Sequence, residues 1–365
     1  MPSIAPAPYA PDVAVPPGAT IRSILQDMGM TQAELAVRMK RPANKINEII
    51  QGKRQVTVET ALELELTLGL PADFWINLEK NYQLNKARLA EESRLDEEAA
   101  TLKKFPLKEM IGLKWIAKRP DTRSQVRELL AFFGITSFCQ LKSVGSLAPA
   151  WRKSQKRQPC GYALCAWLRK GTLKACKIKT AKFDPRSLER GIPEIRKLTM
   201  VSDFADDLIA FCAARGVAVT FVPHLPRSYV NGAAYWLNDK PVIQLSIRNA
   251  WSDVMWFSFF HELCHIIHHE KTDKGFLDDT FGNEGSFVSD DPDKEAEANA
   301  FATNSLIPPD KYRRLLSLEY RRPAVITDFA SKLCVEPGVV VGRLQHDNLL
   351  HHSRLNDLRT KLVWG

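Results

Sequence analysis

One short stretch, residues 259–270, carries more ionisable side chains than a buried helix should. It reads FFHELCHIIHHE, with four histidines and two glutamates among apolar residues. His261 and His265 are four residues apart, so both rings would leave one helical face within reach of a single ion. This HExxH arrangement is typical of zinc sites, in which two imidazoles hold the metal and the intervening glutamate, here Glu262, is the general base. A bound metal is the simplest reason to bury such groups.

A third ligand is expected from the segment 291–309, which predicts a helix that stops before Pro308. Of its two central glutamates we favour Glu295, because Asn299 lies one turn further on and could hydrogen-bond a ligand histidine. Glu297 is the weaker candidate. Two histidines and one glutamate leave one coordination position open, as in catalytic zinc sites, so we expect one Zn²⁺ per chain and a peptide-bond hydrolase.

Other polar side chains near this motif are candidates for supporting roles. Tyr235, Tyr229 and His224 precede it and are candidate oxyanion donors, although each is more often a structural residue. His268 and His269 directly follow the motif, and we expect them to support the ligands or to face solvent.

A run of short helical patterns at 18–84 precedes these elements. Thr31 can cap one helix, and a second helix at about Pro42–Ile50 is closed by Gly52. Two short helices joined by a tight turn are typical of proteins that place a recognition helix in the major groove. The pattern alone also allows a small helical bundle with a solvated face. The residues predicted to contact DNA are Gln32, Ala43, Asn44, Lys45, Asn47, Lys53 and Arg54.

These side chains suit distinct parts of a duplex. Asn and Gln can pair with adenine and Lys with guanine, whereas Lys53 and Arg54, just past the helix, are placed for phosphates. The net charge agrees, because 51 Lys and Arg against 42 Asp and Glu give +9, which favours an anionic partner.

The composition indicates a folded chain of more than one domain. It has 365 residues, of which 45% are hydrophobic and 25% charged. The Pro- and Ala-rich start, 1–17, reads as a flexible leader and not as a signal peptide, and seven cysteines favour reduced thiols. The longest apolar stretch, 254–267, is shorter than the roughly 20 residues that a membrane span needs. We therefore expect a cytoplasmic protein without a membrane partner.

Between the two motifs the sequence is less informative. Residues 85–125 predict a charged connecting helix, and the basic stretch 151–182 could meet DNA phosphates or form an ordinary exposed surface. From 201 onward we expect a helix closed by Gly216, a strand, a hairpin turning at Asn238–Asp239, and the motif helix at about 252–268. The predicted fold class is therefore mainly α with a small β-sheet, α+β.

The front of the chain resembles the XRE-type helix-turn-helix of lambda-repressor-like proteins, and in particular HigA-type antitoxins. The resemblance rests on these residues: Thr31-Gln32, Ile46, Ile49, Gly52-Lys53-Arg54, Val56-Thr57, Thr60-Ala61-Leu62, Gly69 and Phe74-Trp75. It implies a five-helix DNA-binding domain. Pro42 departs from the family pattern beside the recognition helix, so the operator sequence cannot be read.

The second half resembles the ImmA/IrrE metallopeptidase family over roughly 205–310. The matching residues are His261-Glu262-Leu263-Cys264-His265, Glu295, Glu297-Ala298-Asn299, Phe301-Ala302 and Leu306-Ile307-Pro308. The resemblance implies a zincin-like peptidase that cuts an XRE-type repressor. Cys264 stands where the family usually has Gly, and a packed small side chain is the favoured interpretation. The helical tail, 316–365, resembles the segment that follows this peptidase in HigA-type fusions.

We therefore expect five regions: a leader at 1–17, the helix-turn-helix domain at 18–84, a connecting region at 85–200, the peptidase at 201–315 and a helical region at 316–365. The predicted function is a homodimeric, operator-binding regulator that cleaves itself or a partner regulator under stress. One alternative is a HigA-like antitoxin whose zinc site is structural or sensory, with a toxin as partner. Another is a general protease whose front domain recruits substrates.

Overall fold

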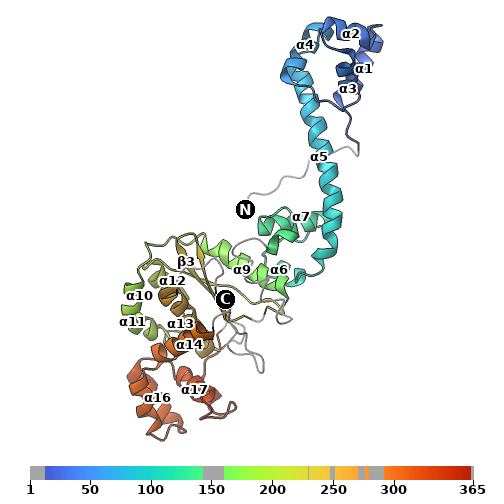
Figure 1. Ribbon diagram of the computed structural model, residues 1–365. Helices are drawn as coiled ribbons and strands as arrows, with labels where there is room; N and C mark the ends of the chain where they lie inside the picture. The colour runs from blue at the N-terminus through green and yellow to red at the C-terminus, as the bar shows by residue number, and fades with distance from the viewer. Residues whose placement is uncertain are drawn as a thin grey trace. The chain divides into compact units, whose positions relative to one another are not determined.

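The computed structural model describes residues 13–142, 160–228, 230–246, 251–269, 276–278 and 292–362 (Figure 1). The chain divides into two compact units, Met1–Ala99 and Ala100–Gly365, and each has its own hydrophobic core. Helices dominate both units and the second adds one small sheet, which confirms the predicted α+β class. Within the described residues, every helix is too short or too polar to traverse a lipid bilayer.

Within the described residues, five helices begin in the first unit, as predicted for its fold. They are α1 (Pro17–Asp27), α2 (Gln32–Arg38), α3 (Ala43–Ile50), α4 (Val58–Leu68) and α5 (Ala72–Leu102). The Thr31 hydroxyl accepts a hydrogen bond of 3.1 Å from the Glu34 amide and so caps α2. Pro42 was predicted as the first residue of the second helix, but its ψ of 136° places it just outside α3. The proline ring still fixes the backbone angle φ at this position and so limits the conformations of the turn.

Close packing of α1 on α3 explains one glycine. A Cβ on Gly18 would lie 2.2 Å from the carbonyl oxygen of Ile50, so only glycine lets the two backbones approach this closely. Gly52 follows α3 with a φ of 69°, a left-handed conformation that ends the helix. These two positions fix where α3, the predicted recognition helix, lies in its unit.

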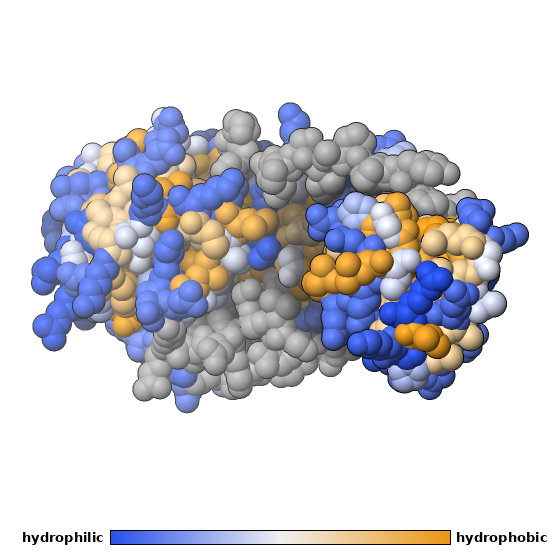
Figure 2. All heavy atoms as spheres, turned by 90° about the horizontal axis from the view of Figure 1, so that it is seen from above, coloured by the Kyte–Doolittle hydropathy of each residue, from blue (hydrophilic) through white to orange (hydrophobic). Residues whose placement is uncertain are grey.

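The long helix α5 supports the loop that follows α3. Glu79 on α5 is buried, and its carboxylate accepts a hydrogen bond of 3.0 Å from the backbone amide of Val56. On α4, by contrast, Val58, Leu62 and Leu66 are exposed at spacings of four residues. Figure 2 shows hydrophobic residues at the surface of the molecule, surrounded by hydrophilic ones.

The second unit begins with helices that lead to the sheet. These are α6 (Leu107–Gly112), α7 (Thr122–Phe133), the 3-10 turn η1 (Phe138–Lys142), α9 (Gly161–Ala175), α10 (Pro185–Arg190), α11 (Ile192–Leu198) and α12 (Ala205–Ala213). The sheet follows, with β1 (Ala218–Phe221), β2 (Gly232–Leu237), β3 (Lys240–Leu245) and β4 (Phe276–Asp278). Its order is β1-β3-β2-β4; β1 pairs with β3 in parallel, and the other pairs are antiparallel. The hairpin turns at Asn238, with a φ of 55°, in agreement with the sequence.

Two helices cover opposite faces of this sheet. Ile243 and Leu245 of β3 belong to the core that includes α13 (Ser252–His268). Gln244, which alternates with them, donates a hydrogen bond of 2.7 Å to the Trp167 carbonyl on α9. The sheet is thus held between α9 and α13, the helix that carries the HExxH motif.

Further helices follow α13 along the chain, and two of them pack directly on it. They are α14 (Pro292–Leu306), α15 (Pro309–Leu316), α16 (Pro323–Leu333), α17 (Pro337–His346) and the 3-10 turn η2 (Asn356–Leu358). Both α14 and α17 contact α13, and the core of the unit runs from α10 through α17. Residues 316–350 therefore share one core with the motif helix. Pro337 and Gly338 form the first two residues of α17, where a proline is well tolerated.

The final segment of the chain clamps the start of α13. The Arg359 guanidinium donates to both carboxylate oxygens of Asp253, at 3.1 and 2.8 Å, and both side chains are nearly buried. The Ser252 amide also donates to the Thr360 carbonyl at 2.9 Å. Burial raises the pKa of Asp253 above its usual value, against the opposing effect of Arg359. This ion pair joins residues far apart in the sequence at the beginning of the motif helix.

Removing Arg359 should destabilise the second unit. We expect Arg359→Leu to cost about 3–5 kcal/mol of unfolding free energy, because it leaves the Asp253 carboxylate buried and uncompensated. Urea unfolding followed by circular dichroism would measure the loss. Arg322→Leu, which breaks an exposed pair with Glu319, should cost less than about 1 kcal/mol. Equal stability of the two variants would contradict a role for the clamp.

Candidate metal centre and DNA-binding surface

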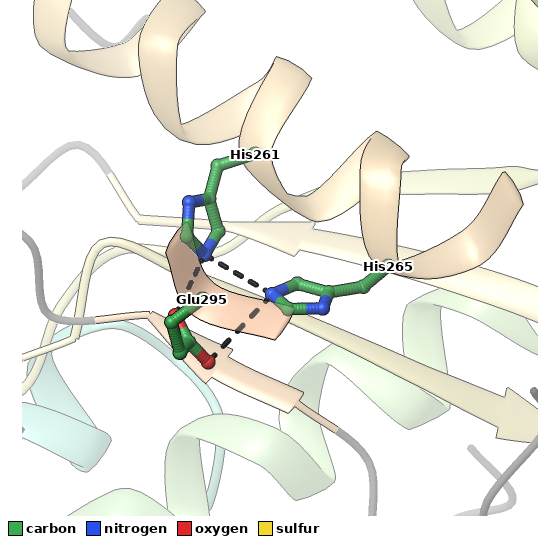
Figure 3. A group of neighbouring side chains, drawn as sticks. All are labelled: His261, His265 and Glu295. Carbon is green, nitrogen blue, oxygen red and sulfur yellow. Dashed lines mark hydrogen bonds and ion pairs between the residues drawn. The ribbon is translucent and has the colours of Figure 1, made fainter. Parts of the chain in front are cut away.

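Three side chains from two helices converge beside the sheet (Figure 3). His261 and His265 project from α13, and Glu295 reaches them from α14. The two Nε2 atoms are 3.1 Å apart, and the Glu295 carboxylate oxygens lie 3.2 Å from His261 Nε2 and 3.8 Å from His265 Nε2. Both histidines are buried, whereas the Glu295 side chain is 22% exposed.

This spacing fits one zinc ion. Ligand atoms about 2.0–2.1 Å from a tetrahedral zinc are separated from one another by roughly 3.3–3.4 Å. The three distances of 3.1, 3.2 and 3.8 Å lie around that value. Two neutral imidazoles and a carboxylate are also a donor set that zinc prefers. The residues present therefore suit the metal that the motif predicts.

The far nitrogen of His261 has a defined partner. Its Nδ1 lies 3.0 Å from Asn299 Oδ1, and an amide oxygen only accepts hydrogen bonds. The ring proton therefore sits on Nδ1, which leaves the Nε2 lone pair directed at the three-ligand cluster. Asn299 lies one helical turn beyond Glu295 on α14, at the offset used to choose between the two glutamates.

Glu262 is fully buried and lies against the backbone of β2. A Cβ built on Gly232 would come within 2.7 Å of its Oε1 and 2.8 Å of its Cγ. A side chain at position 232 would thus displace the predicted general base. Sequence reasoning did not single out Gly232, because a glycine at the start of a strand gives no local sign of what it faces.

The second glutamate of α14 joins a different group. Glu297 lies 3.1 Å from His268 Nδ1 and 3.2 Å from His269 Nε2, and neither of its oxygens is placed with the His261 cluster. Hydrogen bonds from His268, and then from His269, hold the pKa of Glu297 below its usual value. His268 also lies 3.1 Å from Glu189 of α10. Both histidines therefore contact protein groups, and His269 is nearly buried.

Cys264 lies in the same region as Glu297 and His269, within possible ligand distance of both. Burial raises the pKa of its thiol to about 12, with smaller contributions from Glu297 and Glu295. The thiol is therefore protonated at neutral pH, as expected of a packed small side chain. All seven cysteines are free thiols.

Of the predicted oxyanion donors, Tyr235 lies away from this cluster. The Tyr235 hydroxyl donates to Gln244 at 3.0 Å and accepts from Thr172 of α9 at 3.4 Å, so it lies on the face of the sheet opposite α13. The prediction of Tyr235 as an oxyanion donor is therefore wrong. Successive side chains of a strand point to opposite faces, and Tyr235 is on the face turned away from the motif helix. His224 is exposed, and Tyr229 lies outside the described residues.

Most of the residues predicted to contact DNA are exposed in the first unit. Gln32, Ala43, Asn44, Asn47, Lys53 and Arg54 are exposed, and Lys45 is half-buried. Asn47 accepts a hydrogen bond from Gln51 at 3.0 Å, and Glu48 lies 3.4 Å from both Lys45 and Arg54. Exposed amide and basic side chains therefore lie on α3 and directly after it.

The basic stretch at 151–182 is only partly described, since 151–159 lie outside the described residues. In the remainder, Lys174 donates a hydrogen bond of 2.6 Å to the Phe221 carbonyl and Arg169 one of 2.8 Å to the Phe132 carbonyl. Burial lowers the pKa of Lys174. These two cations hold α9 against its neighbours.

Comparisons with known proteins match both halves of the chain. A peptidase-family model described as the IrrE N-terminal-like domain matches residues 213–344, and a model described as helix-turn-helix matches 21–75. Both resemblances stated from the sequence are thereby confirmed. The HExxH helix and α14 lie entirely within the first match, which ends inside α17, and α2 and α3 lie within the second.

Each individual relative matches less than a quarter of this chain, but most of its own length. "Virulence-associated protein I" of Dichelobacter nodosus is 33% identical over 81 residues, which is 22% of this chain and 75% of that protein. Among solved structures, a putative antidote protein of a plasmid maintenance system from Nostoc punctiforme is 29% identical, with a TM-score of 0.22, over 23% of this chain and 91% of that one. The Pseudomonas aeruginosa antitoxin HigA, solved with the higBA promoter, is 28% identical with a TM-score of 0.22, over 24% and 95%.

Proposed function

We propose a function from one premise: this chain belongs to the helix-turn-helix family and carries an IrrE N-terminal-like domain. It is a DNA-binding transcriptional regulator whose second unit is a zinc-dependent endopeptidase. The observation that carries the proposal is the convergence of His261, His265 and Glu295 at distances that suit one metal ion. The exposed polar surface of α3 supports the DNA-binding half.

In the peptidase unit each side chain has a separate task. His261, His265 and Glu295 would hold the metal and leave one coordination position open. Zinc, when bound, supplies the Lewis acidity that activates water and polarises the scissile carbonyl. Glu262 would accept the proton of the attacking water and deliver it to the leaving amine. Its burial against Gly232 restricts the positions that this carboxylate can take.

The substrate that fits this pairing of units is a protein regulator. A chain that binds an operator and cuts a peptide bond can end repression by cleaving itself or a partner repressor when a stress signal arrives. We propose that it acts in the cytoplasm, where operator DNA is available, and binds paired half-sites as a homodimer, because one small reader contacts too few bases for high affinity.

The DNA surface yields a graded prediction. Lys53→Ala and Arg54→Ala should each weaken binding to all duplexes and reduce the slope of log affinity against log salt by about 1, since each removes one phosphate contact. Asn44→Ala should instead cost about 1–3 kcal/mol on the preferred sequence and relax base choice. Selection from a random duplex library followed by fluorescence anisotropy at several salt concentrations would measure both effects.

The control for this series is Lys80→Ala, which removes an exposed cation from α5 in the same unit. It should leave the affinity and the salt slope unchanged. Uniform weakening by all four substitutions would mean that the protein binds DNA through overall charge and not through α3.

A second candidate function has support in the resemblance of the front unit to antitoxins. In that case the protein is a HigA-like repressor, the zinc site is structural or sensory, and a toxin is its partner. An operator–reporter assay separates the two functions. With Glu262→Gln, loss of induction by stress supports the peptidase, whereas induction at the wild-type level supports the antitoxin.

A further inference from the structure

Behind His265, on the side away from Glu295, three side chains form a continuous row. His265 Nδ1 lies 2.8 Å from His269 Nδ1, and His269 Nε2 lies 3.2 Å from Glu297 Oε2. His265 and His269 are nearly buried, whereas Glu297 is half exposed. The row therefore runs from the ligand cluster, through a second imidazole, to a carboxylate at the surface.

The positions of the protons in this row follow from the metal site. A histidine that offers its Nε2 lone pair to a metal carries its proton on Nδ1. His265 Nδ1 must then donate to His269 Nδ1, because two nitrogens 2.8 Å apart share one proton. His269 consequently carries its own proton on Nε2, and that proton points at Glu297.

We propose that His269 and Glu297 are positioning residues that fix the tautomer and raise the basicity of His265 as a metal ligand. The inference rests on the proposed zinc site. A carboxylate behind a ligand histidine is a recurring way to orient the ring and strengthen its bond to zinc. In this chain one more imidazole stands between the carboxylate and the ligand.

The two ligand histidines are therefore supported differently. His261 donates to the neutral amide oxygen of Asn299 at 3.0 Å. His265 donates to an imidazole that is itself polarised by a carboxylate, so its Nε2 is the more electron-rich of the two. His268 lies 3.1 Å from both Glu297 of α14 and Glu189 of α10 and so bridges the two carboxylates.

This arrangement also decides a competing interpretation. Cys264, His269 and Glu297 lie close enough together to bind a second ion. While His265 holds the first metal, however, His269 Nδ1 accepts a proton and Nε2 carries one, so that ring has no lone pair left for another ion. The row therefore predicts one zinc per chain.

The test measures zinc affinity of the full-length protein by competition with a chelator of known affinity. His269→Leu removes both the acceptor and the donor and should weaken zinc binding about 10–100-fold. His269→Gln restores an acceptor and a donor and should recover most of that loss. Glu297→Gln should fall between them. His268→Leu is the matched control, because it touches Glu297 but not His265, and its effect should be smaller than that of Glu297→Gln.

Nitrogen NMR of the histidine rings gives a readout that packing alone would not move. In the zinc-loaded wild type, His265 should carry its proton on Nδ1 and His269 on Nε2, and the His265 signal should change in Glu297→Gln. Wild-type affinity in His269→Leu, or equal losses in the Leu and Gln variants, would overturn the proposal. Two zinc ions per chain, with one lost in Cys264→Ala, would overturn it in favour of a second site.

Failure of the proposed function gives a different result. If the wild-type chain binds no zinc, the metal site itself is wrong. If His261→Ala loses zinc while His269→Leu does not, the metal site stands and only the positioning row is contradicted.

Discussion

His261→Ala is expected to lower zinc affinity by more than about 100-fold. This is a larger loss than the removal of a group that only hydrogen-bonds to a metal ligand would cause. The substitution takes away one of three ligand atoms and leaves His265 and Glu295, 3.8 Å apart, as the remaining members of this cluster among the described residues. Metal analysis of the purified protein and chelator competition would measure the loss. Hydrolysis should disappear together with the metal.

His352→Ala serves as the control for this substitution, because it removes an exposed histidine near the end of the chain. Its zinc content should equal that of the wild type. DNA affinity should be unchanged in both variants, since the helix-turn-helix unit has its own core. Wild-type zinc affinity in His261→Ala would remove the basis of the peptidase proposal.

Glu262→Gln should retain zinc and slow peptide cleavage about 10²–10⁴-fold, the usual contribution of a general base. The amide keeps the shape of the side chain but cannot accept the proton of the attacking water. New termini detected by mass spectrometry, after incubation of the zinc-loaded chain alone and with candidate repressors, would give the rates. Full cleavage by this variant would assign the base elsewhere.

A companion substitution reaches the same group from outside the motif. Gly232→Ala should also slow cleavage with zinc retained, because its Cβ would come within 2.7 Å of the Glu262 carboxylate and force that side chain to move. Gly112→Ala is the matched control, since a Cβ at that position meets no atom within 4 Å. Equal rates for the two alanine variants would mean that the position of Glu262 is not restricted by β2.

The sequence predicts elements whose signals are local. The bounds of α13 follow from its apolar periodicity, the start of α2 from the Thr31 cap, and the end of α3 from Gly52. The preference for Glu295 over Glu297 used only the offset to Asn299 along one helix. Such features depend on neighbours within a turn or two.

Other features depend on contacts that leave no local pattern. The parallel pairing of β1 with β3, the orientation of Tyr235 away from α13, and the proximity of Gly232 to Glu262 all arise from packing between distant segments. The two histidines after the motif could be seen in the sequence, but their sharing of Glu297 depends on how α14 crosses α13.

The bond between Asp253 and Arg359 has a practical consequence for anyone who isolates the second unit. A fragment cut at the limits of the family match, 213–344, would omit Arg359 as well as all of α9. One face of the sheet would be exposed to solvent, and the buried Asp253 carboxylate would lack its cationic partner. Aggregation of that fragment in expression trials would therefore say nothing about catalysis. A fragment from 100 to the last residue keeps both and is the shorter form worth purifying.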